Sequence, residues 1–302
     1  MTAKIIAAVV QQAIGGNDKL TNFTQTQAHI KSATAQGANL IVLQELHATQ
    51  YFCQSEDLSC FDLAEPLDGE TCQRYSDLAA ELNIVIVISG FECRAPGLYH
   101  NTAQVIDGDR GRVGFFRKMH IPDDPGFYEK FYFTPGDAEP ENNYGFKPIE
   151  TRLGKLGLLV CWDQWYPEAA RLMAVAGADM LIYPTAIGWD PEDDADEQFR
   201  QKDAWKTIQR SHAVANGLPV LVANRAGFES SPDNTDTGIE FWGGSFICGP
   251  QGDMLIEANH EEEGAFLAQI DLSRSEKVRQ IWPYFRDRRV DAYKNITKRW
   301  ID

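Results

Sequence analysis

The sequence is poor in basic residues and has no long apolar run. Its 302 residues include 28 lysines and arginines against 44 aspartates and glutamates, a formal net charge of −16. Because nucleic-acid phosphates require a basic face, this balance argues against nucleic acid as a partner and favours cationic ligands. No apolar run approaches the roughly 20 residues needed to span a bilayer, and residues 1–12 contain no obvious signal-peptide cleavage site. We therefore expect a soluble cytoplasmic protein that does not bind a membrane.

The six cysteines are scattered, without a C-x-x-C pair and without a cluster of histidines. Zinc sites and disulfide frameworks depend on such patterns. We therefore expect no metal, no cofactor and no disulfide, and reduced thiols fit the cytoplasm. The hydrophobic content of 43% is ample for a large core without disulfides.

Apolar runs alternate with amphipathic segments in the first two thirds of the chain, and hairpin signals follow in the last third. This order indicates an α/β protein with mixed sheets and helices outside. No composition break suggests a linker, so residues 1–302 are expected to form one domain. The expected strands are 4–11, 40–43, 84–90, 101–106, 113–118, 156–160, 180–184, 220–223, 241–247, 253–257 and 264–270, and the expected helices are 17–36, 71–82, 168–176 and 199–216.

Residues 119–150 contain five of the fourteen prolines, interleaved with aromatic side chains. So long a stretch without regular elements is usually either functional or disordered. The aromatic residues argue against disorder. The pattern therefore predicts a packed loop that forms one wall of a site.

Cys161 stands where a buried strand meets a turn and a helix. Residues 156–160 are apolar and lack helix caps, and Pro167 suits the first turn of the following helix. At such a turn a thiol can be reached by a ligand, and the backbone N–H groups can face an oxyanion. Most free cysteines are simply buried apolar residues, so position alone leaves both readings open.

Residues 160–163 (Val-Cys-Trp-Asp), followed by 166–168 (Tyr-Pro-Glu), resemble the nucleophile segment of the nitrilase (carbon–nitrogen hydrolase) superfamily. Members of that family use a Cys-Glu-Lys triad. Residues 40–45 look like its glutamate strand, 116–120 its lysine segment, and 128–137 the segment with a second glutamate. The resemblance implies four catalytic residues: Cys161, Glu45, Lys118 and Glu129.

The resemblance also implies a fold and a mechanism. The fold is a four-layer α-β-β-α sandwich that forms homodimers or larger homo-oligomers, with the C-terminal tail from about residue 273 at an interface. Glu45 would take the thiol proton, deliver it to departing ammonia and then activate water. Lys118 and the backbone N–H of Trp162 would hold the oxyanion. Glu129 would position substrate or modulate Glu45.

Residues 120–133, 184–189 and 282–289 look like the branch of the family that includes N-carbamoylputrescine amidohydrolases. The implied reaction converts N-carbamoylputrescine to putrescine, carbon dioxide and ammonia. A site for this small cationic substrate needs carboxylates, which the acidic run 190–197 could supply. The same run would also suit a solvated helix N-terminus. The candidate substrate-binding residues are Tyr128, Trp162, Trp189, Asp190 and Asp194.

Two other functions stay open at this point. N-carbamoyl-β-alanine, another N-carbamoyl amino acid or an ω-amide would bring a carboxylate that calls for a bidentate arginine. Arg225 follows an expected strand end and could face the pocket. A nitrilase-fold module without catalysis would serve as a binding subunit, but the intact Cys161, Glu45 and Lys118 argue against it.

Overall fold

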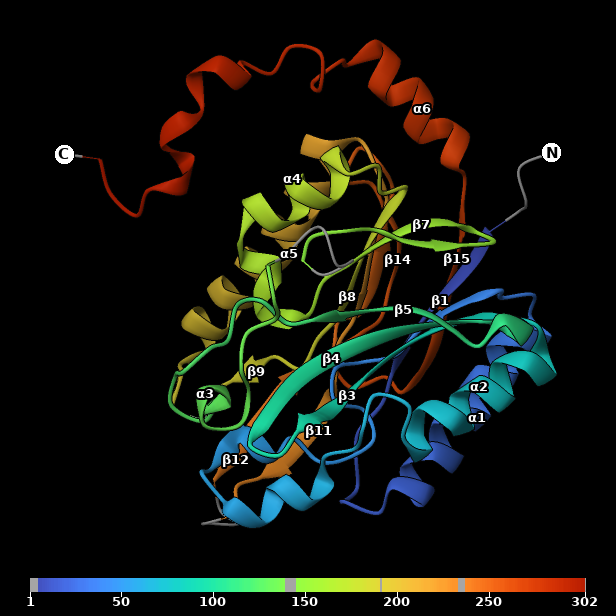
Figure 1. Ribbon diagram of the computed structural model, residues 1–302, viewed down its shortest axis with the longest axis vertical. Helices are drawn as coiled ribbons and strands as arrows, with labels where there is room; N and C mark the ends of the chain where they lie inside the picture. Colours follow the sequence, from blue (N-terminus) through green and yellow to red (C-terminus); the bar gives the residue numbers. More distant parts are fainter. Residues whose placement is uncertain (1–4, 139–144, 191, 233–236, 302) are drawn as a thin grey trace.

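Two six-stranded sheets form the centre of the protein, and helices lie on their outer faces (Figure 1). The structure is a computed structural model that describes residues 5–138, 145–190, 192–232 and 237–301. One apolar cluster fills the space between the sheets and continues under the helices of the second sheet. A second cluster joins the first sheet to its own helices. The predicted four-layer α-β-β-α sandwich with mixed sheets is confirmed.

The first sheet owes its two buried faces to β-branched strands. Along β3, Val85 and Val87 point to the second sheet, whereas Ile86 and Ile88 point to the helices. Because successive side chains alternate, a strand covered on both sides must be apolar throughout. The sheet order is β15 (Gly264–Ile270), β1 (Ile5–Gln11), β2 (Leu40–Val42), β3 (Val85–Ala95), β4 (Leu98–Asp107) and β5 (Arg112–Arg117), and its helices are α1 (Lys19–Ala35) and α2 (Glu70–Leu82).

The second sheet has a parallel centre and antiparallel edges. Strands β7, β8 and β10 run parallel, which brings their C-terminal ends to one edge of the sheet. Met173 and Ala213 pack helices α4 and α5 onto it. The sheet order is β14 (Met254–Glu257), β13 (Phe246–Cys248), β10 (Val220–Ala223), β8 (Met180–Pro184), β7 (Gly154–Leu158) and β6 (Ile149–Thr151), and its helices are α4 (Pro167–Val175) and α5 (Ala195–Asn216).

A small third sheet was not expected from the sequence. It comprises β11 (Ala226–Ser230), β12 (Gly238–Trp242) and β9 (Gly188–Trp189). The predicted strand 241–247 is wrong, because β12 ends at Trp242 and β13 begins at Phe246. Between them Gly243 and Gly244 have φ values of 53° and 62°, and two successive residues in this left-handed region turn the chain and interrupt the extended backbone.

The loop after β5 packs as expected over most of its length. Residues 139–144 of the predicted loop lie outside the described residues. A short helix, α3 (Glu129–Tyr132), interrupts it. Tyr132 and Phe133 join Phe52 and Phe91 in an aromatic cluster, with Phe52 and Tyr132 ring centres 5.0 Å apart. The loop therefore has its own apolar core, which holds α3 against the edge of the site.

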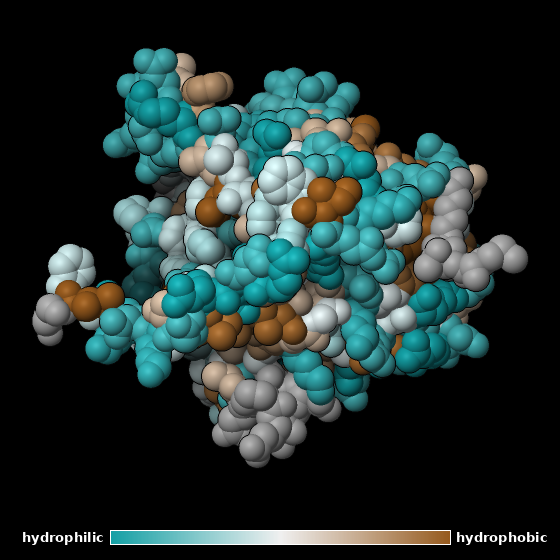
Figure 2. Space-filling model, turned by 90° about the horizontal axis from the view of Figure 1, so that it is seen from above, coloured by the Kyte–Doolittle hydropathy of each residue, from teal (hydrophilic) through white to brown (hydrophobic). Residues whose placement is uncertain are grey.

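The C-terminal tail leaves the body of the molecule and arches over it (Figure 1). It contains α6 (Leu272–Ile281) and two 3-10 turns, Val290–Ala292 and Lys294–Thr297. Ile281 and Trp300 are 74% and 81% exposed. The view from above shows apolar side chains between hydrophilic ones on this side (Figure 2). Within the described ranges, no helix has the length and apolarity required to cross a bilayer.

Candidate active site

Cys161 lies on a strained turn between β7 and α4. Val160 is extended, but Cys161 has φ +42° and opens a 3-10 turn, Cys161–Trp165, that ends just before Pro167 starts α4. A positive φ in a residue with a Cβ costs on the order of 1–3 kcal/mol and clusters at functional sites. The Asp163 carboxylate stabilises the turn by accepting the Val160 N–H at 3.0 Å.

The Cys161 thiol is buried among charged groups. Its sulfur donates to the Ala186 carbonyl oxygen at 3.9 Å. Burial raises the pKa of the thiol well above its usual value, and the charge of Glu45 raises it further, whereas Lys118 lowers it. The thiol is therefore protonated at neutral pH and needs a base at the moment of attack.

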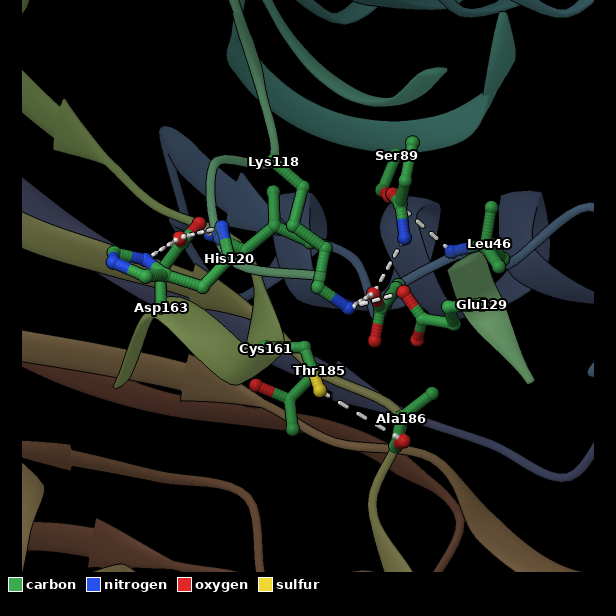
Figure 3. Close-up of polar contacts among 12 residues, drawn as sticks. Leu46, Ser89, Lys118, His120, Glu129, Cys161, Asp163, Thr185 and Ala186 are labelled. Atoms are coloured by element: carbon green, nitrogen blue, oxygen red, sulfur yellow. Dashed lines mark hydrogen bonds and ion pairs between the residues drawn. The ribbon is translucent and has the colours of Figure 1, made fainter. Parts of the chain in front are cut away.

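Lys118 joins two carboxylates beside this thiol (Figure 3). Its ammonium Nζ lies 2.9 Å from Glu45 Oε1 and 2.6 Å from Glu129 Oε2. Glu45 follows β2, Lys118 follows β5 and Glu129 begins α3, and all three side chains are at most 1% exposed. Two carboxylates, one from 73 positions earlier in the chain and one from 11 positions later, thus meet one buried ammonium.

Neighbouring side chains fix both carboxylates. Asn101 donates to Glu45 Oε1 at 2.6 Å, and Tyr51 donates its hydroxyl to Glu129 Oε1 at 2.7 Å. Among the described residues, Glu45 Oε2 is buried without a hydrogen-bond partner. That oxygen is therefore available to receive a proton from a nucleophile.

Two carboxylates on one ammonium leave an excess negative charge. Burial raises the pKa of Glu129 to about 7, a rise that Lys118 opposes and Glu45 reinforces. Burial by itself would lower the pKa of Lys118, but Glu129 and Glu45 outweigh it and raise that pKa well above its usual value. The lysine therefore stays charged, and Glu129 exchanges its proton near neutral pH.

Asp163 connects the lysine segment to the nucleophile turn. Its Oδ1 accepts the His120 backbone N–H at 3.0 Å and lies 2.6 Å from His120 Nδ1, while its Oδ2 holds Val160. The His120 ring stacks on Tyr166 at 3.7 Å between centres. This contact was not predicted from the sequence, although Asp163 lies inside the nucleophile motif.

A cavity of about 620 Å³ opens above Cys161 and Glu129. Its apolar wall includes Trp162, and its rim is acidic. Arg200 lies on the lining and is ion-paired with Glu197 at 2.8 Å. The carboxylates of the lining besides Glu129 are Asp124, Asp190, Asp193 and Glu197.

Two of the five predicted substrate-binding residues, Trp162 and Asp190, line this cavity. The other three do not. Trp189 packs on His260, with ring centres 4.9 Å apart. Asp194 caps α5 by accepting the Glu197 N–H at 2.8 Å, and Tyr128 lies outside the lining. Three lining acids outside the predicted set are Asp124, Asp193 and Glu197, and the last two belong to the acidic run at the helix start.

Arg225 does not face the cavity, contrary to the expectation from its place after β10. The side chain is fully buried and pairs with Glu229 at 2.5 Å. Its guanidinium also donates to the Leu46 carbonyl oxygen at 2.8 Å. An arginine engaged in this way is not available to bind a substrate carboxylate.

Comparison with known proteins gives one family. The sequence matches the carbon–nitrogen hydrolase family over residues 6–280. It is 41% identical over 293 residues to an N-carbamoylputrescine amidase of Solanum tuberosum, with 96% of this chain and 94% of that protein covered. It is 39% identical over 299 residues to a citrullinase of Francisella tularensis, with 99% and 100% covered. The fold matches a crystal structure of a carbon–nitrogen hydrolase from Helicobacter pylori with a TM-score of 0.94 and 50% identity, over 99% and 100% of the two chains.

Proposed function

The chain belongs to the carbon–nitrogen hydrolase family, and from this premise we propose that it hydrolyses N-carbamoylputrescine to putrescine, carbon dioxide and ammonia. The relative from Solanum tuberosum carries the name of this activity. Putrescine is a polyamine, so the reaction would belong to polyamine biosynthesis.

The acidic rim of the cavity above Cys161 is the observation that carries the choice of substrate. N-carbamoylputrescine has a ureide at one end and an ammonium at the other. Asp124, Asp190 and Asp193 lie on the lining, and Arg200 is occupied by Glu197. Carboxylates in a partly enclosed cleft attract an ammonium and disfavour an anion.

The first half-reaction forms a bond between the Cys161 sulfur and the ureide carbon. Glu45 takes the thiol proton as the sulfur attacks, and the carbonyl oxygen becomes an oxyanion. Lys118 and the backbone N–H of Trp162 stabilise that oxyanion, a contribution of roughly 3 kcal/mol per donor. The bond to the terminal nitrogen then breaks, Glu45 gives the proton to that nitrogen, ammonia departs, and the alkylcarbamoyl group stays on the Cys161 sulfur as a thiocarbamate.

The second half-reaction uses water. Glu45 takes a proton from water as the water oxygen attacks the thiocarbamate carbon. The carbon–sulfur bond then breaks, and the sulfur receives the proton from Glu45. The product is N-carboxyputrescine, a carbamic acid that loses carbon dioxide to give putrescine. In both halves Glu129 holds Lys118 in place, with its own carboxylate held by Tyr51.

Ammonia release from matched substrates tests the proposal. N-carbamoylputrescine is compared with N-butylurea, which keeps the ureide and the four-carbon chain but lacks the ammonium. We expect a marked preference for the cationic substrate. Equal kcat/KM values, or a preference for N-carbamoyl-β-alanine, would contradict the proposal.

Replacing a rim acid tests the same point from the protein side. Asp190→Asn should raise KM for N-carbamoylputrescine about 5-fold, the effect of roughly 1 kcal/mol for a partly exposed ion pair, and leave N-butylurea unchanged. Asp196→Asn removes the same charge from an exposed residue of α5 outside the lining and is the matched control. A similar effect of both variants would indicate a general charge effect and no specific contact.

Citrulline is the second candidate, because one relative is named citrullinase. Citrulline has the same ureide but ends in an ammonium and a carboxylate. Arg200 on the lining would meet that carboxylate only by exchanging its ion pair with Glu197, while the acids of the lining would meet the ammonium. Comparing the kcat/KM values for citrulline and N-carbamoylputrescine in the same ammonia assay decides between the two substrates. Arg200→Gln should lower kcat/KM for citrulline only.

The other two functions are supported less well. The case for N-carbamoyl-β-alanine depended on Arg225 facing the pocket, and that side chain is fully buried in an ion pair with Glu229. A subunit without catalysis is at odds with family membership and with the buried group of Glu45, Lys118 and Glu129 beside Cys161.

The proposal also includes self-association of the protein and a cytoplasmic location. The exposed apolar side chains of the tail, among them Ile281 and Trp300, support a homodimer or larger homo-oligomer with the tail at the interface. Light scattering on the full chain measures the subunit number, and a monomer would refute this part. All six cysteines are free, which supports a reducing compartment such as the cytoplasm.

A further inference from the structure

A buried ion pair lies behind the loop that carries Glu45. Arg225 directly precedes β11 and Glu229 lies within it, and their side chains are 0% and 2% exposed. The loop they contact is 180 positions earlier in the chain. Burial of a charged pair is unfavourable unless further hydrogen bonds satisfy both groups. The groups that form hydrogen bonds with this ion pair therefore indicate its role.

The Arg225 guanidinium donates to three carbonyl oxygens of that loop. Its Nη2 lies 3.1 Å from Glu45 O and 2.8 Å from Leu46 O, and its Nη1 lies 3.0 Å from Thr49 O. Leu46 has a φ of +47°, and residues 45–49 belong to no helix or strand. Of the three carbonyls, that of Leu46 also accepts the Thr49 N–H at 3.3 Å. A planar fork of five N–H donors suits such a loop better than any other side chain.

Glu229 extends the contact to the second glutamate of the site. Its Oε1 pairs with Arg225, and its Oε2 accepts the Tyr51 backbone N–H at 2.6 Å. The Tyr51 hydroxyl in turn donates to Glu129 Oε1 at 2.7 Å. Through these bonds one ion pair restrains both carboxylates that flank Lys118.

We propose that Arg225 and Glu229 are positioning residues that hold Glu45 and Glu129 at bonding distance from Lys118 and in line with Cys161. The proposal rests on the catalytic roles proposed above. Neither side chain lines the cavity, so their loss should act on kcat and leave KM within a factor of about two. A displacement of about 1 Å in a catalytic group costs on the order of 100-fold in rate.

Three variants separate positioning from stability. Arg225→Lys keeps the charge but has one nitrogen in place of the fork, so the pair survives and most loop contacts are lost. Arg225→Met leaves Glu229 buried and unpaired. The double variant Arg225→Met/Glu229→Met removes that unpaired charge and should regain part of the melting temperature, because an apolar pair avoids the burial cost.

The measurement is kcat per active site, with sites counted by covalent labelling of Cys161. We expect a fall of about 10-fold or more in Arg225→Lys and about 100-fold in both methionine variants. A kcat that recovers together with the melting temperature in the double variant would overturn the proposal. So would wild-type kcat in Arg225→Lys.

A second readout does not depend on the substrate. The rate of Cys161 alkylation by iodoacetamide, corrected with a Cys161→Ser background, depends on Glu45 taking the thiol proton. It should fall in parallel with kcat, and an unchanged rate in all three variants would refute positioning even if N-carbamoylputrescine is not hydrolysed. Arg279→Met is the control, since Arg279 is half-buried and donates to Asn216 O at 3.0 Å, away from the cavity.

Discussion

The buried glutamate pair predicts an unusual dependence of stability on pH. Glu129 shares Lys118 with Glu45, and burial raises its pKa to about 7 from an ordinary value of 4.5. Glu129→Gln removes this titration but keeps the size of the side chain. Gln can still accept a hydrogen bond from Lys118 through its carbonyl oxygen and donate its amide to the Tyr51 oxygen.

The sign and size of the effect follow from proton linkage. Between pH 4.5 and 7 the folded protein holds a proton that the unfolded chain has released, so the wild type loses stability as the pH rises through this window. Each pH unit in the window corresponds to about 1.4 kcal/mol. The interval from 4.5 to about 7 therefore amounts to about 3 kcal/mol, most of it lost between pH 5 and pH 8. The variant should not show this loss.

Urea unfolding of both proteins at pH 5, 6, 7 and 8, at one protein concentration, measures the difference in the free energy of unfolding. Titrations of other groups are common to the two proteins and cancel. The variant should gain about 3 kcal/mol relative to the wild type across this range. Parallel curves, or a gain for the wild type, would refute the argument that burial, reinforced by Glu45, keeps a proton on Glu129 up to neutral pH.

Two further predictions concern the nucleophile turn. Cys161→Ser should abolish ammonia release and leave the thermal unfolding temperature nearly unchanged, because the two side chains differ little in size. Ammonia release at the wild-type rate would refute the role of Cys161 as nucleophile. Asp163→Ala leaves the N–H groups of Val160 and His120 without their acceptor, at about 1–3 kcal/mol for each buried group. The alanine variant should therefore have a lower unfolding temperature and a lower kcat. Asp163→Asn keeps one acceptor oxygen and should show a smaller decrease in both. Equal unfolding temperatures for the wild type and the alanine variant would contradict this role for the carboxylate.

Local pattern predicted the strands that are buried on both faces. β8 and β10 begin and end at the predicted residues, and Gly37, with φ +97°, follows the predicted end of α1. These elements depend on near neighbours in the sequence. The pair Gly243 and Gly244 was misread because a glycine with positive φ looks, in sequence, like any small residue in an apolar run.

The acidic run at residues 190–197 shows where local pattern reaches its limit. Asp194 caps α5, as the helix-start interpretation predicts, while Asp190, Asp193 and Glu197 line the cavity, where their role toward a substrate stays a prediction. The sequence contains the charges but not the direction of each side chain, which depends on how α5 begins. For the same reason Trp189 was expected at the substrate and packs against His260 instead.

The amino-acid sequence alone was enough to identify the candidate catalytic residues, since Cys161, Glu45, Lys118 and Glu129 each stand in a recognisable local motif. Tertiary structure decided their mutual distances and the partner of Arg225, which binds carbonyl oxygens 176–180 positions away. The physical reason is that a backbone carbonyl exists at every position, so a sequence cannot indicate which ones a buried arginine will bind. Only the packing of β10 and β11 against the loop after β2 brings that guanidinium to those oxygens.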